Sequence, residues 1–288
     1  MNLVAVVLNW NGGDDTLAAL ASLDGIATIC VDNASTDGSD RLVAERFPHV
    51  ELIRNSANLG FAGGNNPGIR RALERGADWV LLLNNDAVAE PGLADALERA
   101  ALARPDAGLL ACKVLSADGT TVQYAGAGFN RWLGYSGRVS TSGPDELRDV
   151  ARADGAAMAV SRAAVERAGL LDVELFAYVE DVEWSLRIRR AGFGIVFVPD
   201  ARARHKGSGS TGGRRSTTNL YYDTRNTIVV SERHAPLPPG LRALRRGVVV
   251  GAHLAQAATH PSRGEAARAV LAGWRDARAG RLGQRSSA

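Results

Sequence analysis

The chain has 288 residues, of which 45% are hydrophobic and 23% are charged. This composition excludes an intrinsically disordered protein, a collagen-like protein and a small disulfide-rich scaffold. The formal charge is only +3, but it is unevenly distributed: residues 235–288 contain nine arginines and two acidic residues, so this tail carries +7 and the preceding residues carry −4.

The first third of the chain alternates between short apolar runs and helical patterns. Apolar runs without polar alternation suit strands that are buried on both faces. We expect strands at 3–8, 26–31, 50–53 and 79–83, and helices at 16–23, 40–47 and 69–75. This alternation predicts an α/β fold with a parallel, doubly wound sheet.

The pattern becomes less regular beyond residue 90. We expect helices at 91–104, 178–191 and 219–233, strands at 108–115, 156–160 and 195–198, and a hairpin with loops over 120–144. A Gly/Ser-rich segment at 207–213 indicates a flexible loop, and 236–240 indicates a linker to basic helices. The chain contains no internal repeat.

Cysteine usage and the N-terminal sequence indicate a cytoplasmic protein. Cys30 and Cys112 each lie inside an apolar run and belong to no CxxC pair, so we expect buried, reduced thiols. Residues 1–10 lack the features of a signal peptide, and no apolar stretch approaches the ~18 residues of a membrane span. We therefore expect a soluble or peripherally bound protein.

Polar side chains follow each of the four strands expected in the first third. In open parallel sheets, ligands bind beyond the carboxyl ends of the strands, so four polar ends in succession predict a polar rim around a ligand site. Asn and Asp also favour turns, which leaves turn formation as the alternative. The residues concerned are Asn9, Asn11, Asp32, Asn33, Asn55, Asn58, Asn84, Asn85 and Asp86.

The glycines near residue 60 do not form a dinucleotide-binding fingerprint. Gly60, Gly63 and Gly64 lack the GxGxxG spacing, and the chain has no P-loop, which disfavours a nicotinamide-dependent enzyme and an NTPase. A nucleotidyltransferase is disfavoured as well, because residues 9–13 carry no nearby Lys or Arg that would bind a triphosphate.

Several longer motifs occur in order between residues 3 and 233. They are VVLNWNG at 6–12, VDNASTDGS at 31–39, NLGFAGGNN at 58–66, LLNND at 82–86 and FAYVEDVEWSLRIRRAG at 176–192. Together they resemble the inverting family 2 glycosyltransferases of GT-A fold, and the last motif, with the segment 199–211, resembles the rhamnosyltransferase-like branch. One position departs from the pattern: the family's metal motif is often Asp-x-Asp, whereas this chain has Asn84-Asn85-Asp86.

The resemblance implies an α/β fold of GT-A type, with a doubly wound, mostly parallel sheet and a Rossmann-like nucleotide-binding half. It divides the chain into a catalytic domain at 1–234, with a nucleotide-sugar-binding half at 1–115 and an acceptor half at 116–234, and a basic amphipathic helical tail at 235–288.

The resemblance also implies an activity. The enzyme would transfer a sugar from a nucleotide diphosphate to a hydroxyl of a glycan or a lipid-linked acceptor, in bacterial cell-surface polysaccharide synthesis. dTDP-rhamnose is the favoured donor, and UDP-sugars come next. The alternative, suggested by the missing first acid of the metal motif, is a catalytically silent sugar-binding or scaffold protein.

Particular residues are assigned to the donor by the same resemblance. Asp32 matches the acid that accepts a hydrogen bond from the pyrimidine N3, a charge-assisted pair, although an Asx turn before Ser35 would use the same carboxylate. Arg225, in the motif YYDTRN, is assigned to the phosphates. The remaining residues assigned to the nucleotide sugar are Asn9, Asn11, Asn58, Asn84 and Asn85.

Departure of the diphosphate adds negative charge that the site must neutralise. By resemblance, Asp86 and His205 hold a divalent metal, Mg²⁺ or Mn²⁺, because one or two carboxylates plus phosphate oxygens normally suffice and an imidazole ligand favours Mn²⁺. A lone histidine is more often structural, which is the alternative for His205. The segment 206–215, rich in Gly and with three basic residues, suits either a lid over the diphosphate or a solvated loop.

Inversion requires a base that takes the proton from the acceptor hydroxyl as this hydroxyl attacks the anomeric carbon. The resemblance assigns this role to Asp181. This residue lies at the start of the helix expected at 178–191, where the positive helix end favours the ionised carboxylate. The alternative is that Glu180, Asp181 and Glu183 form an acidic first turn that only caps the helix.

Apolar residues of the tail fall on helical stripes that have arginines beside them. Two such helices suit either peripheral contact with an anionic membrane, at the inner face of the plasma membrane, or packing on the catalytic domain or across a homodimer. No nucleic-acid partner is expected. The stripes comprise Leu241, Leu244, Val248, Ala252, Ala255, Val270, Leu271 and Trp274, and the arginines are Arg242, Arg245, Arg246, Arg268, Arg275 and Arg278.

Overall fold

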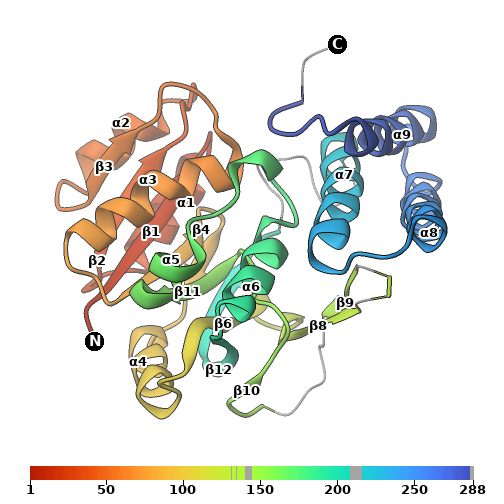
Figure 1. Cartoon of the computed structure of the whole chain (residues 1–288). Coiled ribbons are helices and arrows are strands. Elements are labelled where there is room, and N and C mark those ends of the chain that lie inside the picture. Colours follow the sequence, from red (N-terminus) through yellow and green to blue (C-terminus); the bar gives the residue numbers. More distant parts are fainter. Residues whose placement is uncertain (131, 134, 140–144, 208–215, 286–288) are drawn as a thin grey trace.

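A ten-stranded sheet forms the centre of the molecule (Figure 1). The computed structural model describes residues 1–130, 132–133, 135–139, 145–207 and 216–285. Eight strands follow the order β10-β12-β6-β11-β4-β1-β2-β3, while β5 pairs with β12 and β7 pairs with β6. A separate ribbon pairs β8 (Ala127–Asn130) with β9 (Tyr135–Val139).

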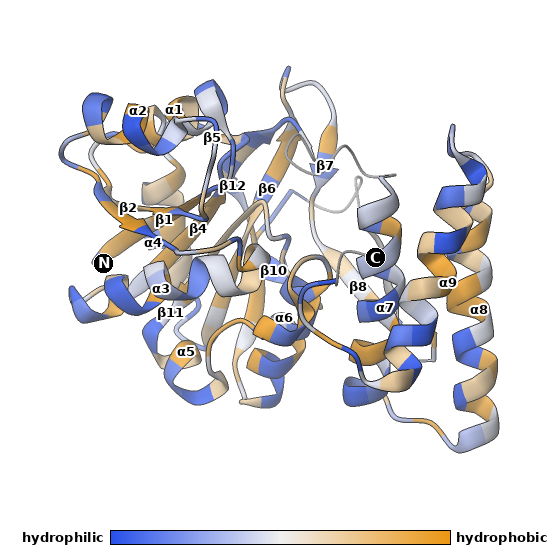
Figure 2. Cartoon of the chain, turned by 90° about the horizontal axis from the view of Figure 1, so that it is seen from above, coloured by the Kyte–Doolittle hydropathy of each residue, from blue (hydrophilic) through white to orange (hydrophobic). Residues whose placement is uncertain are grey.

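Four parallel strands and three helices build the N-terminal half of the sheet. They are β1 (Leu3–Asn9), α1 (Gly13–Ala21), β2 (Ala27–Asp32), α2 (Ser39–Arg46), β3 (Glu51–Arg54), α3 (Gly60–Glu74) and β4 (Trp79–Asn84). β1 pairs in parallel with β2 and β4, and β2 with β3. Because α1 and α2 lie on one side of the sheet and α3 on the other (Figure 2), the strands are covered on both faces. The parallel, doubly wound arrangement expected from the apolar runs is confirmed.

Helix α3 begins at Gly60, well before the start expected at residue 69. Glycine usually disfavours a helix, but here it permits close contact with the sheet. A Cβ atom at Gly64 would lie 2.6 Å from a methyl group of Leu8, and one at Gly68 would lie 2.5 Å from a methyl group of Val6. Packing on β1 therefore stabilises a helical turn that local propensity does not predict.

The second half of the sheet mixes strand directions. Because β11 runs antiparallel to both β4 and β6, β6 and its parallel neighbour β12 run in the same direction as β4. The sheet as a whole is therefore mostly parallel. β12 extends well beyond the strand expected at 195–198, because the strand continues through an irregularity between Val198 and Arg202. The elements are β5 (Ala87–Ala89), β6 (Ala107–Ser116), β7 (Val122–Tyr124), β10 (Arg148–Asp149), β11 (Ala157–Ser161) and β12 (Gly194–His205).

Three further helices and one 3₁₀ turn accompany this half. They are α4 (Leu93–Ala103), α5 (Arg162–Ala168), η1 (Val173–Leu175) and α6 (Glu180–Arg190). Helix α5 was not expected, because its seven residues are too few to show an apolar period in the sequence. It begins at Ser161, whose side chain accepts a hydrogen bond from the Ala164 N–H.

The last three helices pack together beside the sheet (Figure 1). They are α7 (Thr217–His234), α8 (Pro239–Ala257) and α9 (Arg263–Ala279). α9 crosses α7 closely, since a Cβ atom at Gly273 would lie 2.4 Å from the Tyr221 carbonyl oxygen. The residues expected to link the domain to the tail, 236–240, lead directly into α8, which begins at Pro239.

Apolar residues lie on both faces of α8, and on the packed face Val250 and Leu254 contact the cluster around Leu220. Val249, His253 and Ala257 are buried in contact with the neighbouring helices, whereas Leu241, Leu244 and Val248 are 47%, 65% and 46% exposed.

One arginine of the tail is buried where a flanking basic residue was expected. Arg245 donates to the carbonyl oxygens of Ala235 and Ser231 at 2.6 and 3.2 Å, so it caps the C-terminal end of α7. Arg245 thus lies off the apolar stripe, as expected, but on the face of α8 that packs against α7.

Both cysteines are free and buried, as expected, and burial raises the pKa of each thiol to about 12. None of the helices among the described residues combines the length and the apolar character that crossing a bilayer requires.

Candidate active site

The carboxyl ends of β1, β2 and β4 meet at one edge of the sheet. Asn9 pairs in register with Asp32, and Leu8 pairs with Asn84, so the polar residues that end these strands are neighbours. Parallel pairing brings about this convergence, because all three strands run in the same direction. The rim predicted from the four strand ends is therefore present at this edge.

Asn9 organises the first part of the rim. Its side chain is fully buried and donates to Asp32 Oδ1 and Ser39 Oγ, both at 2.8 Å. Its oxygen accepts from the Thr16 hydroxyl at 2.7 Å and from the Gly12 N–H at 3.2 Å. With these partners, Asn9 fixes the orientation of the Asp32 carboxylate, while its own side chain is fully buried and not accessible to a ligand.

Asp32 makes the turn hydrogen bond that was the alternative to base binding. Its Oδ2 accepts from the Ser35 N–H at 3.1 Å. An ionised carboxylate has about four acceptor positions, so the turn and a ligand do not exclude each other. Beside it, Asn11 joins the loops after β1 and β2: its N–H donates to Ser35 Oγ at 2.9 Å and its Oδ1 accepts from the Thr36 N–H at 2.7 Å.

The other rim asparagines differ in how much of their side chain is engaged. Asn58 Oδ1 accepts from Asn33 Nδ2 and from the Gly60 N–H, both at 2.9 Å, and so holds the start of α3. Asn85 Nδ2 donates to the Thr16 hydroxyl at 3.3 Å. Asn84 is partly exposed at the end of β4. Of the three, Asn84 has the side chain most open to a ligand.

Asp86 and His205 meet at the same edge from distant parts of the sequence. Asp86 directly precedes β5, and His205 ends β12, to which β5 is paired. The His205 Nε2 atom lies 3.1 Å from Asp86 Oδ1, and Nε2 makes no hydrogen bond within the described part of the chain. Their side chains are only 15% and 7% exposed.

Gln123 determines which ring nitrogen of His205 carries hydrogen. The Gln123 amide nitrogen donates to the His205 carbonyl oxygen at 3.0 Å, so the amide oxygen faces Nδ1 at 3.2 Å. Nδ1 must then be the donor, and in the neutral imidazole this leaves a lone pair on Nε2, the atom that lies nearest the Asp86 carboxylate. Two electron-rich atoms at this separation suit a shared cation. Gln123 was not predicted, because a single glutamine in an irregular segment carries no signal in the sequence.

Two protein ligands are fewer than a closed metal site uses. Among the described residues, no group of three or more His, Cys, Asp or Glu side chains could hold an ion. The pair Asp86 and His205 therefore fits an open site, in which other oxygen ligands complete the coordination. Their chemistry suits a divalent cation bound together with an anionic ligand.

Asp181 lies next to this edge. The Asn84 N–H donates to the Ala156 carbonyl oxygen at 3.0 Å, and the neighbouring Gly155 N–H donates to Asp181 Oδ2 at 3.2 Å. Arg152 Nη1 lies 3.6 Å from the same oxygen. Burial raises the pKa of Asp181, and the positive charge of Arg152 partly offsets this rise. The carboxyl group is thus held by fixed donors beside the end of β4.

The acidic residues at the start of α6 have different environments. Glu183 is paired with Arg187 at 2.8 Å and with His234 at 3.2 Å, and despite burial these partners keep its pKa below the ordinary value. Asp181 faces Arg152 instead. Glu183 therefore holds helices together, while Asp181 contacts Gly155 and Arg152 near the end of β4.

The backbone before α6 is strained. Phe176, Tyr178 and Val179 have φ angles of 64°, 67° and 70°, a region that costs about 1–3 kcal/mol for a non-glycine residue. The amide nitrogen of Asn226, on α7, lies 2.7–2.9 Å from carbonyl oxygens of residues 175, 177 and 178. Asn226 thus holds the conformation that places Asp181.

Arg225 serves the same segment and does not face the rim. The residue is 1% exposed, and its guanidinium donates to the carbonyl oxygens of Leu175 at 3.0 Å and Gly283 at 2.7 Å. The guanidinium also lies over the aromatic rings of Tyr221 and Tyr222. Because these contacts enclose the cation, the assignment of Arg225 to the phosphates is not retained.

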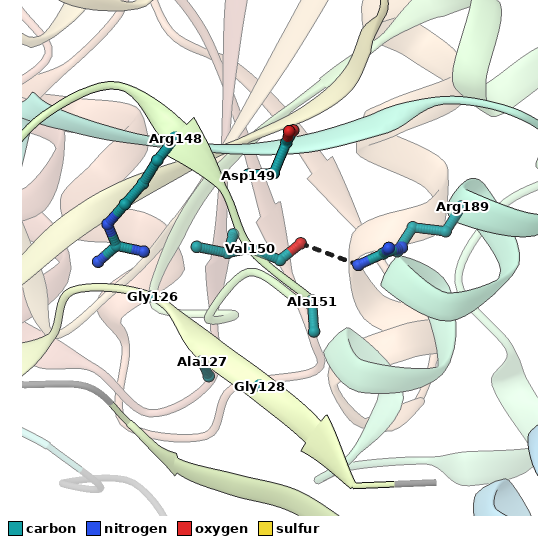
Figure 3. Close-up of a pocket in the computed structure, with 8 residues that line it drawn as sticks. All are labelled: Gly126, Ala127, Gly128, Arg148, Asp149, Val150, Ala151 and Arg189. Atoms are coloured by element: carbon teal, nitrogen blue, oxygen red, sulfur yellow. Dashed lines mark hydrogen bonds between the residues drawn. The ribbon is translucent and has the colours of Figure 1, made fainter. Parts of the chain in front are cut away.

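A shallow pocket lies elsewhere, between β8, β10 and α6 (Figure 3). It has a volume of about 340 Å³, and its two arginines are engaged: Arg189 donates to the Val150 carbonyl oxygen and Arg148 to that of Ala125. None of the residues assigned to the site lines it. The proposed lid at 206–215 falls mostly outside the described residues, which include only Lys206 and Gly207 of that segment.

Comparison with known proteins finds relatives along most of the chain. The model of the family described as glycosyltransferase-like family 2 matches residues 17–226. The chain is 31% identical to the N-acetylglucosaminyl-diphospho-decaprenol L-rhamnosyltransferase of Mycobacterium tuberculosis over 290 residues, 88% of this chain and 94% of that protein. It is 25% identical to the dTDP-rhamnosyl transferase RfbF of Shigella flexneri over 259 residues, 84% of each chain.

A solved structure supports the fold independently. The mannosyltransferase PcManGT of Pyrobaculum calidifontis, determined in complex with GDP-Man and Mn²⁺, superimposes with a TM-score of 0.57 and 18% identity. The match covers 96% of this chain and 75% of that one. The expected GT-A-type α/β fold is confirmed.

Proposed function

The chain belongs to glycosyltransferase-like family 2, and on this premise we propose that it transfers L-rhamnose from dTDP-rhamnose to a hydroxyl group of a lipid-linked glycan. It is a nucleotide-sugar glycosyltransferase. The observation that carries the proposal lies at the end of β4. There the Asn84 N–H donates to the Ala156 carbonyl oxygen, and the N–H of the adjacent Gly155 donates to the buried acid Asp181. One edge of the sheet thereby offers both a donor site and a base.

The donor is proposed to lie along the rim. Asp32 would accept a hydrogen bond from the N3–H of the thymine base, and Asn9 would keep that carboxylate oriented. Asn11 and Asn84 would contact the rest of the nucleotide sugar. Asn58 and Asn85 support this site through the loops that they fix, since their side chains are hydrogen-bonded within the protein.

Asp86 and His205 are proposed to hold a divalent metal at the diphosphate. When bound, such an ion neutralises the charge that develops on the leaving group. The imidazole ligand favours Mn²⁺ over Mg²⁺. The same ion is present in the complex of the mannosyltransferase from Pyrobaculum calidifontis.

Asp181 is proposed to act as the general base. It would take the proton from the acceptor hydroxyl as the hydroxyl oxygen attacks the anomeric carbon, on the side opposite the diphosphate, so the configuration inverts. Arg152 favours the ionised form of Asp181 that this step requires.

The donor and the acceptor are proposed from the relatives. The mycobacterial relative is named for L-rhamnose transfer to N-acetylglucosaminyl-diphospho-decaprenol, and the Shigella relative for dTDP-rhamnose. We propose the same classes here, with residues 1–115 binding the donor, residues 116–234 binding the acceptor, and residues 235–288 forming an accessory helical tail.

A donor panel tests this function. With Mn²⁺ and a lipid-linked N-acetylglucosaminyl diphosphate, we expect release of dTDP from dTDP-rhamnose to exceed release of UDP from UDP-sugars by about tenfold or more, because a pocket that fits one methyl group discriminates by that order. Nucleotide release and mass spectrometry of the glycolipid measure the two products. Faster use of a UDP-sugar would contradict the donor, and the absence of turnover with every donor would contradict catalysis.

The exposed face of α8 is proposed to contact an anionic membrane that carries the acceptor. Leu241, Leu244 and Val248 are 47%, 65% and 46% exposed on α8, and exposed arginines such as Arg242 and Arg275 lie on the same helical pair. Burial of apolar side chains at the lipid boundary favours membrane binding, and each arginine near an anionic surface contributes about 1 kcal/mol to the free energy of binding. A charged bilayer therefore fits this face better than a neutral one.

Flotation with vesicles tests the membrane contact. Deleting the tail would uncover the buried residues of α7, so point variants are the cleaner test. We expect the chain to float with phosphatidylglycerol vesicles but not with phosphatidylcholine vesicles, and combined Leu241→Ser, Leu244→Ser and Val248→Ser to lower the bound fraction at least about tenfold. Leu102→Ser, at a 78% exposed position on α4, is the matched control. Equal flotation of both variants would assign the face of α8 to another partner.

A further inference from the structure

Glu180 is a buried acid without a hydrogen-bond partner for one of its oxygens. It is the first residue of α6, directly before Asp181, and is only 6% exposed. Its Oε2 atom makes no hydrogen bond within the described part of the chain. Glu183, one turn later on the same helix, is paired with both Arg187 and His234. Since buried polar groups are nearly always paired, the carboxyl group of Glu180 retains the capacity for a further hydrogen bond beside the candidate base.

We propose that Glu180 is a binding residue for the acceptor, and that its carboxyl group hydrogen-bonds a hydroxyl of the acceptor sugar beside Asp181. The proposal rests on the function proposed above, because it uses Asp181 as the base. It adds a second contact to the acceptor, which fixes the orientation of the attacking hydroxyl as well as its position.

The charges around Glu180 favour a neutral ligand. The acids that face it come from three elements: Asp181 on α6, Asp154 in the segment before β11, and Asp223 on α7. Arg152 lies 3.6 Å from Asp181 and His253 lies 3.3 Å from Asp223, so these two acids are partly balanced. Together with Asp154 and Glu180 itself, the surroundings still favour an uncharged sugar hydroxyl over an anionic diphosphate. The residue therefore suits the acceptor sugar and not the phosphates of the donor.

Glu180 and Asp181 are held in different protonation states. Burial raises the pKa of Glu180 well above its ordinary value, and the charge of Asp181 raises it further. Asp181 is buried as well, but Arg152 lowers its pKa relative to burial alone. As the pH rises, Asp181 therefore loses its proton before Glu180 does, and while Glu180 keeps its proton it can donate to an acceptor oxygen as Asp181 accepts from the attacking hydroxyl.

This arrangement predicts the shape of the pH profile. Activity rises as Asp181 loses its proton, and Glu180 is still neutral at that point. Activity falls at higher pH, because ionised Glu180 no longer donates and places a second negative charge beside the base. The alkaline limb of kcat/KM for the acceptor therefore belongs to Glu180, and the acid limb belongs to Asp181.

Glu180→Gln separates the two limbs, because the amide stays neutral and remains a donor at every pH. We expect this variant to keep acceptor KM within about threefold, to retain the acid limb at its wild-type pH, and to lose the alkaline limb. Glu180→Leu should raise the acceptor KM about tenfold or more, since the hydrogen bond is gone, and should unfold no earlier than the wild type, because an unpaired buried polar group is removed. Glu166→Gln, at an exposed position on α5, is the matched control.

The result that would overturn the proposal is an unchanged alkaline limb in Glu180→Gln, or an unchanged acceptor KM in Glu180→Leu. Slow hydrolysis of dTDP-rhamnose without acceptor distinguishes this failure from failure of the proposed function. If all variants and the wild type hydrolyse the donor equally, the donor site and the enzyme class are retained, and a failed prediction for Glu180 concerns only its role in acceptor binding. If the wild type neither hydrolyses nor transfers any donor, the proposed function itself fails.

Discussion

Replacing Asp181 with asparagine is expected to lower turnover about 10²- to 10⁴-fold, the usual contribution of a general base. The amide has nearly the same volume as the carboxylate, so the packing at the start of α6 is preserved. Its oxygen can still accept from the Gly155 N–H, which now donates to Asp181 at 3.2 Å. What is lost is the ability to take a proton from the acceptor hydroxyl.

Affinity for the donor should stay within about threefold in the same variant, because none of the rim contacts depends on the basicity of Asp181. Steady-state kinetics give turnover, and calorimetry with dTDP gives donor affinity. Asp24→Asn is a matched control, since this acid is exposed in the turn after α1. A parallel loss of donor affinity and thermal stability in Asp181→Asn would identify the residue as a helix cap.

The strands that bear the rim could be predicted because burial on both faces leaves a simple pattern. The runs at 3–8 and 79–83 contain no charged residue, and both became central strands of the parallel sheet. Helix α3 could not be located in the same way. Its glycines serve contacts with Leu8 and Val6, which are distant in the sequence, and those contacts override local propensity.

The positions of candidate site residues could be predicted best where they lie at the end of a strand. Asn9 and Asp32 fall at neighbouring strand ends, so topology alone brings them together. Arg225 shows the limit of this reasoning. A guanidinium suits phosphate groups and carbonyl oxygens equally well, and only the fold shows that the donors of Arg225 reach the segment before α6.

The tail shows a similar limit. A helical period identifies an apolar stripe but does not say which face of the helix packs. On α8 the neighbouring helices cover Val249 and Ala257, and Arg245 turns inward to cap α7, while Leu241, Leu244 and Val248 stay exposed. The distinction depends on the order in which α7, α8 and α9 are packed, which the sequence of α8 alone does not contain.

Asp86→Ala and His205→Ala are each expected to abolish the stimulation of turnover by Mn²⁺, with a loss of about 10²-fold or more at saturating metal, the scale of removing one electrostatic contact to the leaving group. Both side chains lie at the rim and not in the apolar core, so the fold should be retained in each variant. The effect should be specific to metal, because the base Asp181 and the carboxylate of Asp32 are unchanged.

Binding of Mn²⁺ in the presence of dTDP provides a readout besides activity, and Gln123→Ala sharpens it. Among the described residues, both side-chain hydrogen bonds of Gln123 are made with His205, whose Nδ1–H the amide oxygen accepts. Removing this side chain therefore frees the ring to adopt the other tautomer, in which Nε2 carries the hydrogen. We expect Mn²⁺ affinity to fall about 10- to 100-fold in Gln123→Ala, as for other residues that orient a metal ligand, and to be undetectable in His205→Ala. If Mn²⁺ affinity is unchanged in all three variants, Asp86 and His205 form an ordinary ion pair, and charge on the leaving diphosphate must be neutralised by other groups of the protein.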